Sequence, residues 1–288
     1  MKRVLCLSEC CLDVVFTGLP KLPADGEEVW SSGFAVRAGG GANTPITLAG
    51  QGVPVRYLTA YAEDLPGQLI EKALLSAGIT PVLSHRRPAR TAVSAVLSTS
   101  DDRAFASFGG DGSPGFDKVQ TAREVREADI VHSYFGYAAD LDLFGLCRDS
   151  GVLLSLDLSR SDAARGDEAT LLSACDLVKM NADEAARFTG CTRPEDALRI
   201  LASLVRGAAV ITLGKDGSIA LRHEEETILR QPAVSAGTIL DACGAGDAFA
   251  AGLLAALARE ESLESGLARG AKLAAHALTL TGGNDAGP

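Results

Sequence analysis

Residues 241–252 have the sequence Asp-Ala-Cys-Gly-Ala-Gly-Asp-Ala-Phe-Ala-Ala-Gly, which predicts a glycine turn followed by an alanine-rich helix that continues to about Arg259. The glycines allow a tight turn whose backbone N–H groups point at a ligand, and the start of the helix adds about half a positive charge. This combination predicts an anion site at Gly244, Ala245 and Gly246, and a transferring phosphoryl group is an anion that suits it.

Asp247 lies in the first turn of the predicted helix, beside this anion site. A carboxylate next to a phosphate is unfavourable unless it takes up a proton, and a hydroxyl group that attacks phosphorus would supply one. Asp247 is therefore a candidate catalytic base. The alternative is that Asp247 only stabilises the first turn of the helix, an effect of ~0.3–1 kcal/mol.

The chain before this turn alternates short apolar runs with amphipathic or alanine-rich stretches. We expect strands at 4–7, 55–59, 130–133, 152–157, 177–180 and 208–213, and helices at 42–50, 69–77, 141–148, 195–205 and from 182 onward. A strand-then-helix alternation of this kind is typical of an α/β fold with a doubly covered, mostly parallel sheet.

Two segments interrupt the alternation. Residues 13–36 and 91–109 have strand character without a helix of their own, and we expect them to form a small antiparallel β lid beside the main sheet. A later hairpin is expected at 217–221 and 227–229. Because no linker or internal repeat separates these parts, residues 1–288 are predicted to form a single domain with this lid.

The composition limits the class of protein. A net charge of −10 argues against a nucleic-acid partner, and the longest apolar stretch, 248–258, is shorter than the ~20 residues that a membrane helix needs. The seven cysteines and four histidines have no zinc-ligand spacing. We therefore expect free thiols in a cytoplasmic protein that binds neither nucleic acid nor membrane.

Three more motifs carry candidate ligand contacts. Gly39-Gly40-Gly41-Ala42-Asn43 opens the predicted helix at 42–50, and Asn43 offers donors and an acceptor to sugar hydroxyls. The alternative is a flexible turn with Asn43 as N-cap. The stretches Asn181-Ala-Asp-Glu184 and Thr212-Leu-Gly-Lys-Asp-Gly217 each follow a strand, and either would be an ordinary turn or helix cap if it stood alone.

Together these motifs, in this order and spacing, resemble the ribokinase-like (phosphofructokinase B type) carbohydrate kinases. The resemblance covers essentially the whole chain, and it includes the strand before Asp13, the stretches 22–27 and 63–67, and Asp157-Leu-Ser-Arg160, where the family usually has Asn in place of Ser159. Arg160 would reach a phosphate or lie on the surface. The resemblance implies an ATP-dependent kinase that phosphorylates a hydroxyl group of a sugar-like molecule.

The resemblance also implies a role for each motif residue. Asp247 matches the catalytic base, and the backbone of 245–247 matches the anion hole for the γ-phosphate. The sugar-binding positions correspond to Asp13, Gly40, Gly41 and Asn43, and the nucleotide-binding positions to Asn181, Thr212, Gly214 and Gly217. Asn181 and Glu184 match the motif that organises Mg²⁺ through water, and Asp241 matches part of a monovalent-cation site that some members have.

Other nucleotide-binding motifs fit poorly, because Gly214-Lys215 lacks the glycine and Ser/Thr of a Walker loop and Gly39–Gly41 does not complete a dinucleotide fingerprint. A nucleoside kinase of the same family stays open, as does a non-catalytic sugar-binding or nucleotide-binding protein with this fold. Sparse aromatic residues in the lid favour a free sugar over a nucleoside. Arg86, Arg87 and Arg103 would suit an acidic or phosphorylated sugar, or are simply solvated. The free edges of the lid strands suggest a homodimer joined through the lid.

Overall fold

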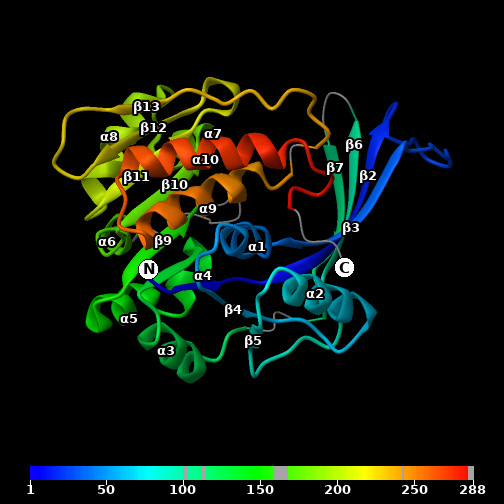
Figure 1. The fold of residues 1–288 in the computed structure, drawn as a ribbon, viewed down its shortest axis with the longest axis horizontal. Coiled ribbons are helices and arrows are strands. Elements are labelled where there is room, and N and C mark those ends of the chain that lie inside the picture. The colour runs from blue at the N-terminus through cyan, green and yellow to red at the C-terminus, as the bar shows by residue number, and fades with distance from the viewer. Residues whose placement is uncertain (100–102, 112–114, 159–167, 242, 285–288) are drawn as a thin grey trace.

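A computed structural model describes residues 1–99, 103–111, 115–158, 168–241 and 243–284, and its main element is a nine-stranded sheet (Figure 1). The strand order is β13-β12-β11-β10-β9-β8-β1-β4-β5, and all neighbours are parallel except the pairs β11–β12 and β12–β13. The strands are β1 (Val4–Leu7), β4 (Val55–Thr59), β5 (Pro81–Leu83), β8 (Ile130–Tyr134), β9 (Leu153–Asp157), β10 (Leu177–Asn181), β11 (Ala208–Thr212), β12 (Ser218–Arg222) and β13 (Leu229–Gln231).

The strands of this sheet are mainly apolar because helices cover both faces, and the exceptions include Arg56 in β4 and Lys179 in β10. In β1, Leu5 and Leu7 pack into one hydrophobic cluster, whereas Val4 and Cys6 pack into another on the opposite face. The second face is covered by α1 (Asn43–Gly50), α2 (Leu65–Ser76), α9 (Ala245–Ala258) and α10 (Leu263–Ala277). The first face is covered by α3 (Lys118–Arg126), α4 (Phe135–Asp140), α5 (Leu143–Ser150), α6 (Glu168–Leu172), α7 (Ala182–Thr189) and α8 (Pro194–Leu204). This arrangement confirms the predicted α/β fold class.

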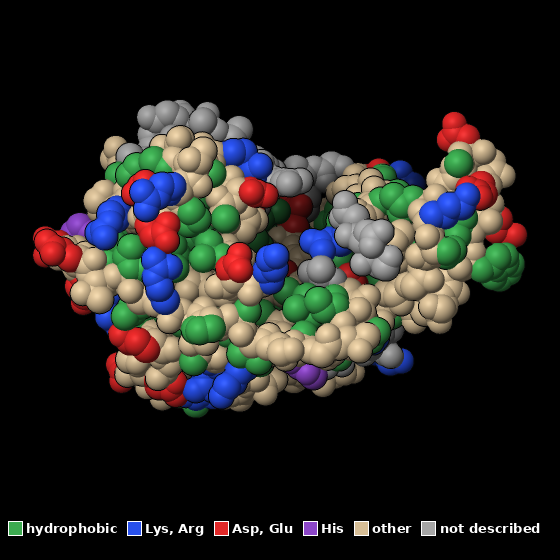
Figure 2. All heavy atoms as spheres, turned by 90° about the horizontal axis from the view of Figure 1, so that it is seen from above, with side chains coloured by type: hydrophobic (Ala, Val, Ile, Leu, Met, Phe, Trp, Pro, Cys, Tyr) green, Lys and Arg blue, Asp and Glu red, His purple; other side chains and the backbone are tan. Residues whose placement is uncertain are grey.

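The lid is a separate four-stranded sheet that projects from the main body (Figures 1 and 2). It has the order β3-β2-β6-β7 and consists of β2 (Cys10–Leu19), β3 (Gly33–Gly40), β6 (Val93–Thr99) and β7 (Arg103–Phe108). The predicted antiparallel lid needs one correction, because β2 and β6 pair in parallel and the sheet is mixed. Parallel neighbours need a long crossover, and the chain between β2 and β6 provides one by passing through the main sheet.

Figure 2 shows a hollow between the main body and the projecting lid. The described cysteines, which are all seven in the chain, are free thiols, as the sequence predicts. No helix in the described part of the chain combines the length and the apolar character that a bilayer crossing requires.

Candidate active site

The candidate site lies at the carboxyl ends of the parallel strands of the main sheet. Tyr134, Asp157, Asn181 and Thr212 end four neighbouring strands, β8 to β11. In open α/β sheets this edge is where ligands bind. The inner face of the lid closes the site from the other side, where Ser98 Oγ of β6 donates to Asp241 Oδ1 at 3.4 Å.

The glycine turn before α9 has a conformation that only glycine adopts easily. Gly244 has φ +72°, and a Cβ atom there would lie 3.1 Å from backbone atoms of Gly283. The C-terminal loop therefore packs directly against the turn. Gly244 is the N-cap of α9, and Ala245, Gly246 and Asp247 form its first turn.

Asp247 is bonded to side chains from two distant elements. Asn43 Nδ2 of α1 donates to Asp247 Oδ2 at 3.2 Å, and the hydroxyl of Tyr134 donates to Oδ1 at 3.2 Å. Thr44 Oγ1 approaches the same carboxylate at 3.5 Å. These contacts fix the carboxylate beside the glycine turn, which a residue that only stabilises its own helix would not need.

Asn43 acts through its side chain and is not the N-cap of α1. The N-cap is Ala42, and no side chain caps this helix. Asn43 Oδ1 instead accepts a hydrogen bond from Asn284 Nδ2 at 2.7 Å, while Asn284 also donates to the carbonyl of Ala38. Asn284 therefore orients Asn43 so that its amide group points at Asp247.

Burial raises the pKa of Asp247 above its ordinary value. The ammonium group of Lys179 acts in the opposite direction, as do the hydrogen bonds from Asn43 and Tyr134, whereas the negative charge of Asp157 adds to the increase. A carboxyl group with a raised pKa is a better proton acceptor than an ordinary aspartate.

Asp13 lies on the inner face of the lid, over Gly39. A Cβ atom at Gly39 would lie 1.8 Å from Asp13 Oδ2, so the lid strand β3 needs glycine at this point. Cys11 Sγ donates to Asp13 Oδ1 at 3.1 Å. Burial raises the pKa of Asp13, and the negative charges of Asp241 and Asp247 raise it further. The three carboxylates are therefore close enough to repel one another.

The other two predicted sugar-binding residues form the turn between β3 and α1. Gly40 is exposed and has φ +58°. The N–H of Gly41 donates to the carbonyl of Glu9 at 3.1 Å, and a Cβ atom at Gly41 would overlap with Ser8. The turn thus approaches the end of β1 closely and leads directly to Asn43.

Asn181 and Glu184 have the helix-cap role that was one alternative for their motif. They form a capping box at the start of α7, in which Asn181 Oδ1 accepts from the N–H of Glu184 at 2.9 Å and Glu184 Oε2 accepts from the N–H of Asn181 at 2.8 Å. The second carboxylate oxygen of Glu184 has no hydrogen-bond partner among the described residues. It is thus left for a ligand or its water.

The strand end at Thr212 and the following turn lie next to Asn181. Thr212 pairs with Asn181 across β10 and β11, and Thr212 Oγ1 donates to the carbonyl of Met180 at 3.4 Å. Gly214 and Gly217 both have positive φ. A Cβ atom at Gly217 would overlap with the backbone of β13. Packing by itself therefore explains why residue 217 is glycine.

Asp241 anchors two loops through its carboxylate oxygens. Its Oδ1 accepts from the N–H of Cys243 at 3.0 Å, and its Oδ2 accepts from the N–H of Gly282 at 3.1 Å. Among the described residues, no group of three or more His, Cys, Asp or Glu side chains could hold a metal ion. An ion here would therefore depend on ligands from the nucleotide, water or backbone.

Several residues of the site escaped the sequence analysis. Tyr134 and Asn284 carry no local signal, because they bond to partners far away in the chain. Lys179 does carry one, since it is a charged residue in the apolar strand β10, and its Nζ lies 3.0 Å from Asp157 Oδ2. Arg160 lies outside the described residues.

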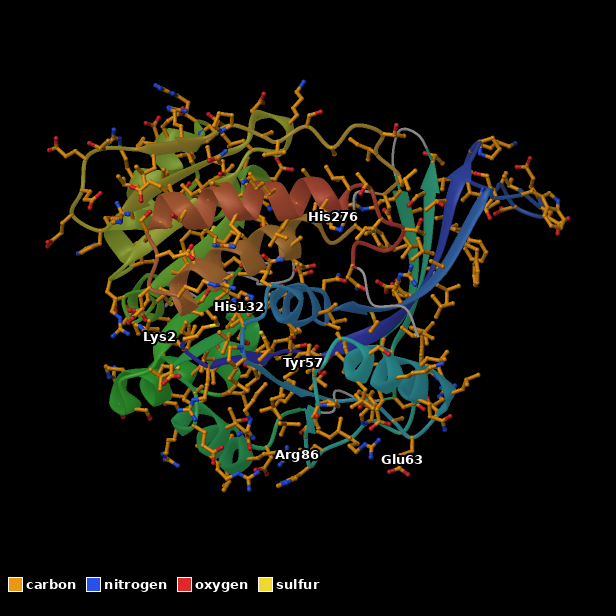
Figure 3. All side chains as sticks on the ribbon, viewed as in Figure 1. Lys2, Tyr57, Glu63, Arg86, His132 and His276 are labelled. Carbon is orange, nitrogen blue, oxygen red and sulfur yellow. The ribbon has the colours of Figure 1, made fainter. Side chains whose placement is uncertain are left out.

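Of the three arginines considered for a sugar phosphate, Arg86 and Arg87 lie away from the site (Figure 3), whereas Arg103 pairs with Ser98 in the register of the lid and so lies on its inner face. Arg87 donates to the carbonyl of Tyr61 and forms an ion pair with Glu63 at 2.8 Å. Figure 3 shows Arg86 and Glu63 far from α9, on the opposite side of the molecule from His276. Arg103 lies over the ring of Phe105, with 5.8 Å between the guanidinium carbon and the ring centre.

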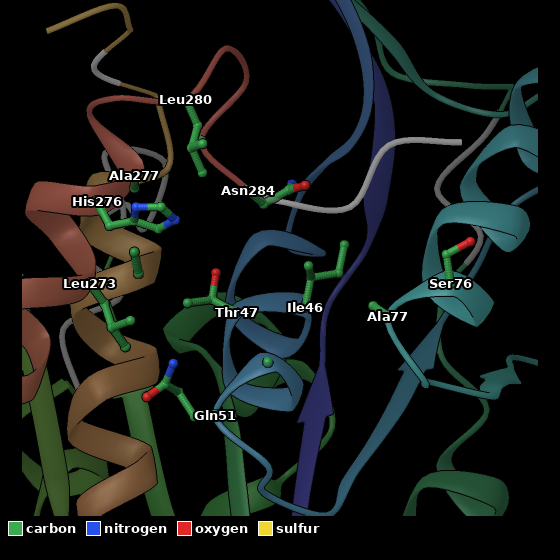
Figure 4. A pocket seen from close by; sticks show the side chains of 13 residues that line it. Ile46, Thr47, Gln51, Ser76, Ala77, Leu273, His276, Ala277, Leu280 and Asn284 are labelled. Atoms are coloured by element: carbon green, nitrogen blue, oxygen red, sulfur yellow. The ribbon is translucent and has the colours of Figure 1, made fainter.

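A cavity of about 400 Å³ opens behind the site, between α1 and α10 (Figure 4). Thr47, Gln51, His276 and Asn284 are among its lining residues. Asp247 does not line it, although the hydrogen bonds of Asn284 lead from this cavity to Asn43. The cavity is therefore a neighbour of the candidate active site and not its substrate pocket.

Known proteins resemble this chain in sequence. The family model of the pfkB family carbohydrate kinases matches residues 1–288. Ribokinase from Arabidopsis thaliana is 25% identical over 93% of this chain and 74% of its own length. Fructokinase from Rhizobium leguminosarum bv. trifolii is 27% identical over 88% of this chain and 80% of its own length, and fructoselysine 6-kinase from Shigella flexneri is 27% identical over 98% and 99%.

Solved structures show the same fold. The structure of Arabidopsis thaliana ribokinase complexed with ribose and ATP matches with a TM-score of 0.80 and 23% identity, and covers 97% of this chain and 93% of that chain. A putative ribokinase from Agrobacterium tumefaciens matches with a TM-score of 0.84 and 21% identity, and covers 100% and 94%.

Proposed function

This chain belongs to the pfkB family of carbohydrate kinases, and we propose that it transfers the γ-phosphoryl group of ATP to a hydroxyl group of an unphosphorylated sugar or sugar-like alcohol. The observation that carries the proposal is the placement of Asp247 in the first turn of α9, where Asn43 and Tyr134 hold its carboxylate beside the anion-binding turn.

In this proposal, Asp247 takes the proton of the acceptor hydroxyl as that oxygen attacks the γ-phosphorus. The bond to the bridging oxygen of ADP breaks, and the N–H groups of residues 245–247 stabilise the negative charge on the transferring group. The raised pKa of Asp247 supports this role, because the base must bind the proton it receives.

Asp13, Gly40, Gly41 and Asn43 would bind the acceptor in the hollow under the lid. Asp13 and Asn43 present an acceptor and a donor to neighbouring hydroxyl groups, and the bare backbone at Gly40 and Gly41 lets the sugar approach. The carboxylates of Asp13, Asp241 and Asp247 share this region, which disfavours an acceptor that already carries a phosphate. The engagement of Arg87 with Glu63 also supports a free sugar.

The nucleotide would lie along the ends of β10 and β11, with its phosphates directed at the start of α9. Asn181, Thr212, Gly214 and Gly217 border this path. The unpaired oxygen of Glu184 fits a Mg²⁺ ion held through water, and the ion would neutralise charge on the phosphates. Asp241 would support a monovalent cation through the two loops it anchors.

The assay that tests the proposal measures ADP release with a panel of free sugars, sugar phosphates and nucleosides, in the presence of Mg²⁺ and ATP. We expect turnover with a free sugar that Asp247→Asn abolishes. Turnover with nucleosides alone would favour a nucleoside kinase. Binding of a sugar without turnover of any acceptor would favour a non-catalytic binding protein.

A homodimer through the lid is the second part of the proposal. The register of the lid places Val14, Phe16, Phe34, Val36, Ala95, Leu97, Ala104 and Ala106 on the face opposite to Asp13, and we call these residues the outer lid face. Phe34 is 62% exposed, and its ring contacts that of Phe16, with 5.4 Å between ring centres. A second copy would cover this apolar face by the same face of its own lid, as twofold symmetry permits.

A further inference from the structure

The hydroxyl of Tyr134 reaches from the main sheet to the base. Tyr134 ends β8, and the register places it beside Asp157 of β9. His132, two residues earlier, pairs with Cys6, which packs on the face of the sheet that α9 covers. Side chains two residues apart in a strand share a face, so Tyr134 lies on that face too. Its phenol oxygen is 3.2 Å from Asp247 Oδ1 at the start of α9.

Tyr134 is the donor in this contact. Burial and the negative charges of Asp247 and Asp157 raise the pKa of Tyr134 well above its ordinary value, so the phenol keeps its proton. An ionised carboxylate only accepts hydrogen bonds. Among the described residues, Asp247 is the hydrogen-bond partner of this hydroxyl. A bond of this kind is charge-assisted and favours the ionised form of the carboxyl group.

Charged groups act on Asp247 from the neighbouring strands and from the lid. Burial and the negative charge of Asp157 in β9 raise the pKa of Asp247, whereas the ammonium group of Lys179 in β10 lowers it. Asp13 of the lid strand β2 adds a further negative charge within reach of Asp247. His132 of β8 contributes no charge at neutral pH, because burial lowers its pKa to about 4.

Neutral groups complete the surroundings of Asp247. Helix α1 has no ionisable side chain, and its Asn43 and Thr44 contact the carboxylate as neutral donors. Tyr57 of β4 is a neutral phenol, because burial raises its pKa well above the ordinary value. On α10, His276 lines the cavity behind the site, and Asp247 does not line that cavity. Removal of the phenol hydroxyl from β8 therefore changes no charge around the base.

We propose that Tyr134 is a positioning residue of the base, whose hydroxyl donates to Oδ1 of Asp247 and holds the carboxylate ionised and oriented until the acceptor hydroxyl gives up its proton. This inference rests on the proposed function. The acceptor oxygen bonds to the γ-phosphorus, the bond to ADP breaks, and the hydroxyl proton goes to Asp247, while Tyr134 keeps its own proton. Asn43 is shared between the base and the proposed sugar site, whereas the hydroxyl of Tyr134 is bonded to the base.

The first test measures the pH profile of kcat in Tyr134→Phe, which keeps the ring and removes only the hydroxyl. Loss of a hydrogen bond to the ionised form raises the pKa of Asp247, so the acid limb of kcat should move to higher pH by about one unit, a ~10-fold loss of kcat on that limb. At higher pH, kcat should recover to within about 10-fold of the wild type, and the KM of the acceptor should change by less than about threefold. Tyr61→Phe is the matched control, because the buried Tyr61 hydroxyl has no hydrogen-bond partner among the described residues.

The second test needs no turnover and measures thermal midpoints as a function of pH. The bond from Tyr134 favours the ionised form of Asp247, so its contribution to stability is present above the pKa of Asp247 and is lost as pH falls through it. The stability lost in Tyr134→Phe should therefore be larger at neutral pH than in acid. In an Asp247→Asn background, the loss caused by Tyr134→Phe should not depend on pH, because no carboxylate ionises there.

An acid limb that stays in place in Tyr134→Phe would overturn the proposal, as would a stability loss that is independent of pH. A higher acceptor KM with an unmoved acid limb would make Tyr134 an acceptor contact and would also overturn it. These outcomes are separable from a failure of the proposed function. If the wild type phosphorylates no acceptor, the kinase reaction fails, and a pH-dependent stability loss still supports the bond from Tyr134 to Asp247. If Asp247→Asn abolishes turnover while the acid limb of Tyr134→Phe is unmoved, only the inference on Tyr134 fails.

Discussion

At the scale of the residue, the base and the helix-cap interpretations of Asp247 predict different outcomes for Asp247→Asn. Asparagine keeps the shape of the side chain but cannot accept the proton, so kcat should fall by about 10²- to 10⁴-fold. ATP and sugar should still bind, because the carboxylate no longer repels the γ-phosphate. Steady-state kinetics measures the fall in kcat, and calorimetry measures the binding of ATP and sugar. A variant that keeps more than about a tenth of wild-type kcat would refute the base assignment.

The raised pKa of Asp247 predicts the pH dependence of both activity and stability. The base works only when deprotonated, so kcat should fall with decreasing pH at values above the ordinary aspartate range. The charged carboxylate is disfavoured in the folded protein, so stability is lost as pH rises through this pKa. Asp247→Asn should therefore melt above the wild type at neutral pH, and the difference should shrink in acid. A difference that is independent of pH would contradict this prediction.

At the scale of the element, the start of α7 allows the cap and the metal role of Glu184 to be separated. Glutamine can replace glutamate in a capping box, so Glu184→Gln should keep the fold and the thermal midpoint. It lacks the charge that would order water around Mg²⁺, and the Mg²⁺ concentration for half-maximal activity should rise by about 10-fold or more. Excess EDTA should abolish activity in both forms. An unchanged Mg²⁺ requirement would mean that Glu184 only caps the helix.

The crossing of α9 and α10 depends on two glycines in contact. A Cβ atom at Gly252 would lie 2.3 Å from the backbone nitrogen of Gly270, so Gly252→Ala must push the helices apart. We expect a loss of about 1–3 kcal/mol in the free energy of unfolding, measured by denaturant titration. Gly50→Ala is the control, since a Cβ atom there meets nothing within 4 Å. Equal stability of the two variants would show that the helices adjust without cost.

At the scale of the whole molecule, the outer lid face predicts the oligomeric state. Light scattering should give a mass near twice the 29.7 kDa of the chain, and Phe34→Glu should give the monomer, because a buried charge in the apolar interface is costly. Phe105→Glu is the matched control, as Phe105 is an exposed aromatic residue on the opposite lid face. A wild-type monomer at micromolar concentration would rule out the dimer.

The local sequence determined the elements that have one clear pattern. The strands at 4–7 and 55–59 have the predicted bounds, because short and mainly apolar runs are typical of strands that are covered on both faces. The helix after Gly244 starts where the glycine turn predicts, and the capping box at Asn181 follows from residue type and spacing alone. These features depend on neighbours within a few residues, so the sequence contains all that fixes them.

The tertiary structure alone decided which side chains meet. Asp247 finds its partners 204 residues away at Asn43 and 113 residues away at Tyr134, and no local pattern encodes contacts at such separations. The same holds for Lys179, whose strand character was predictable but whose charge acquired a partner only when β9 came to lie beside β10. The parallel pairing of β2 and β6 was likewise set by the path of the intervening chain through the main sheet, because strand direction depends on the crossover and not on the strand residues themselves.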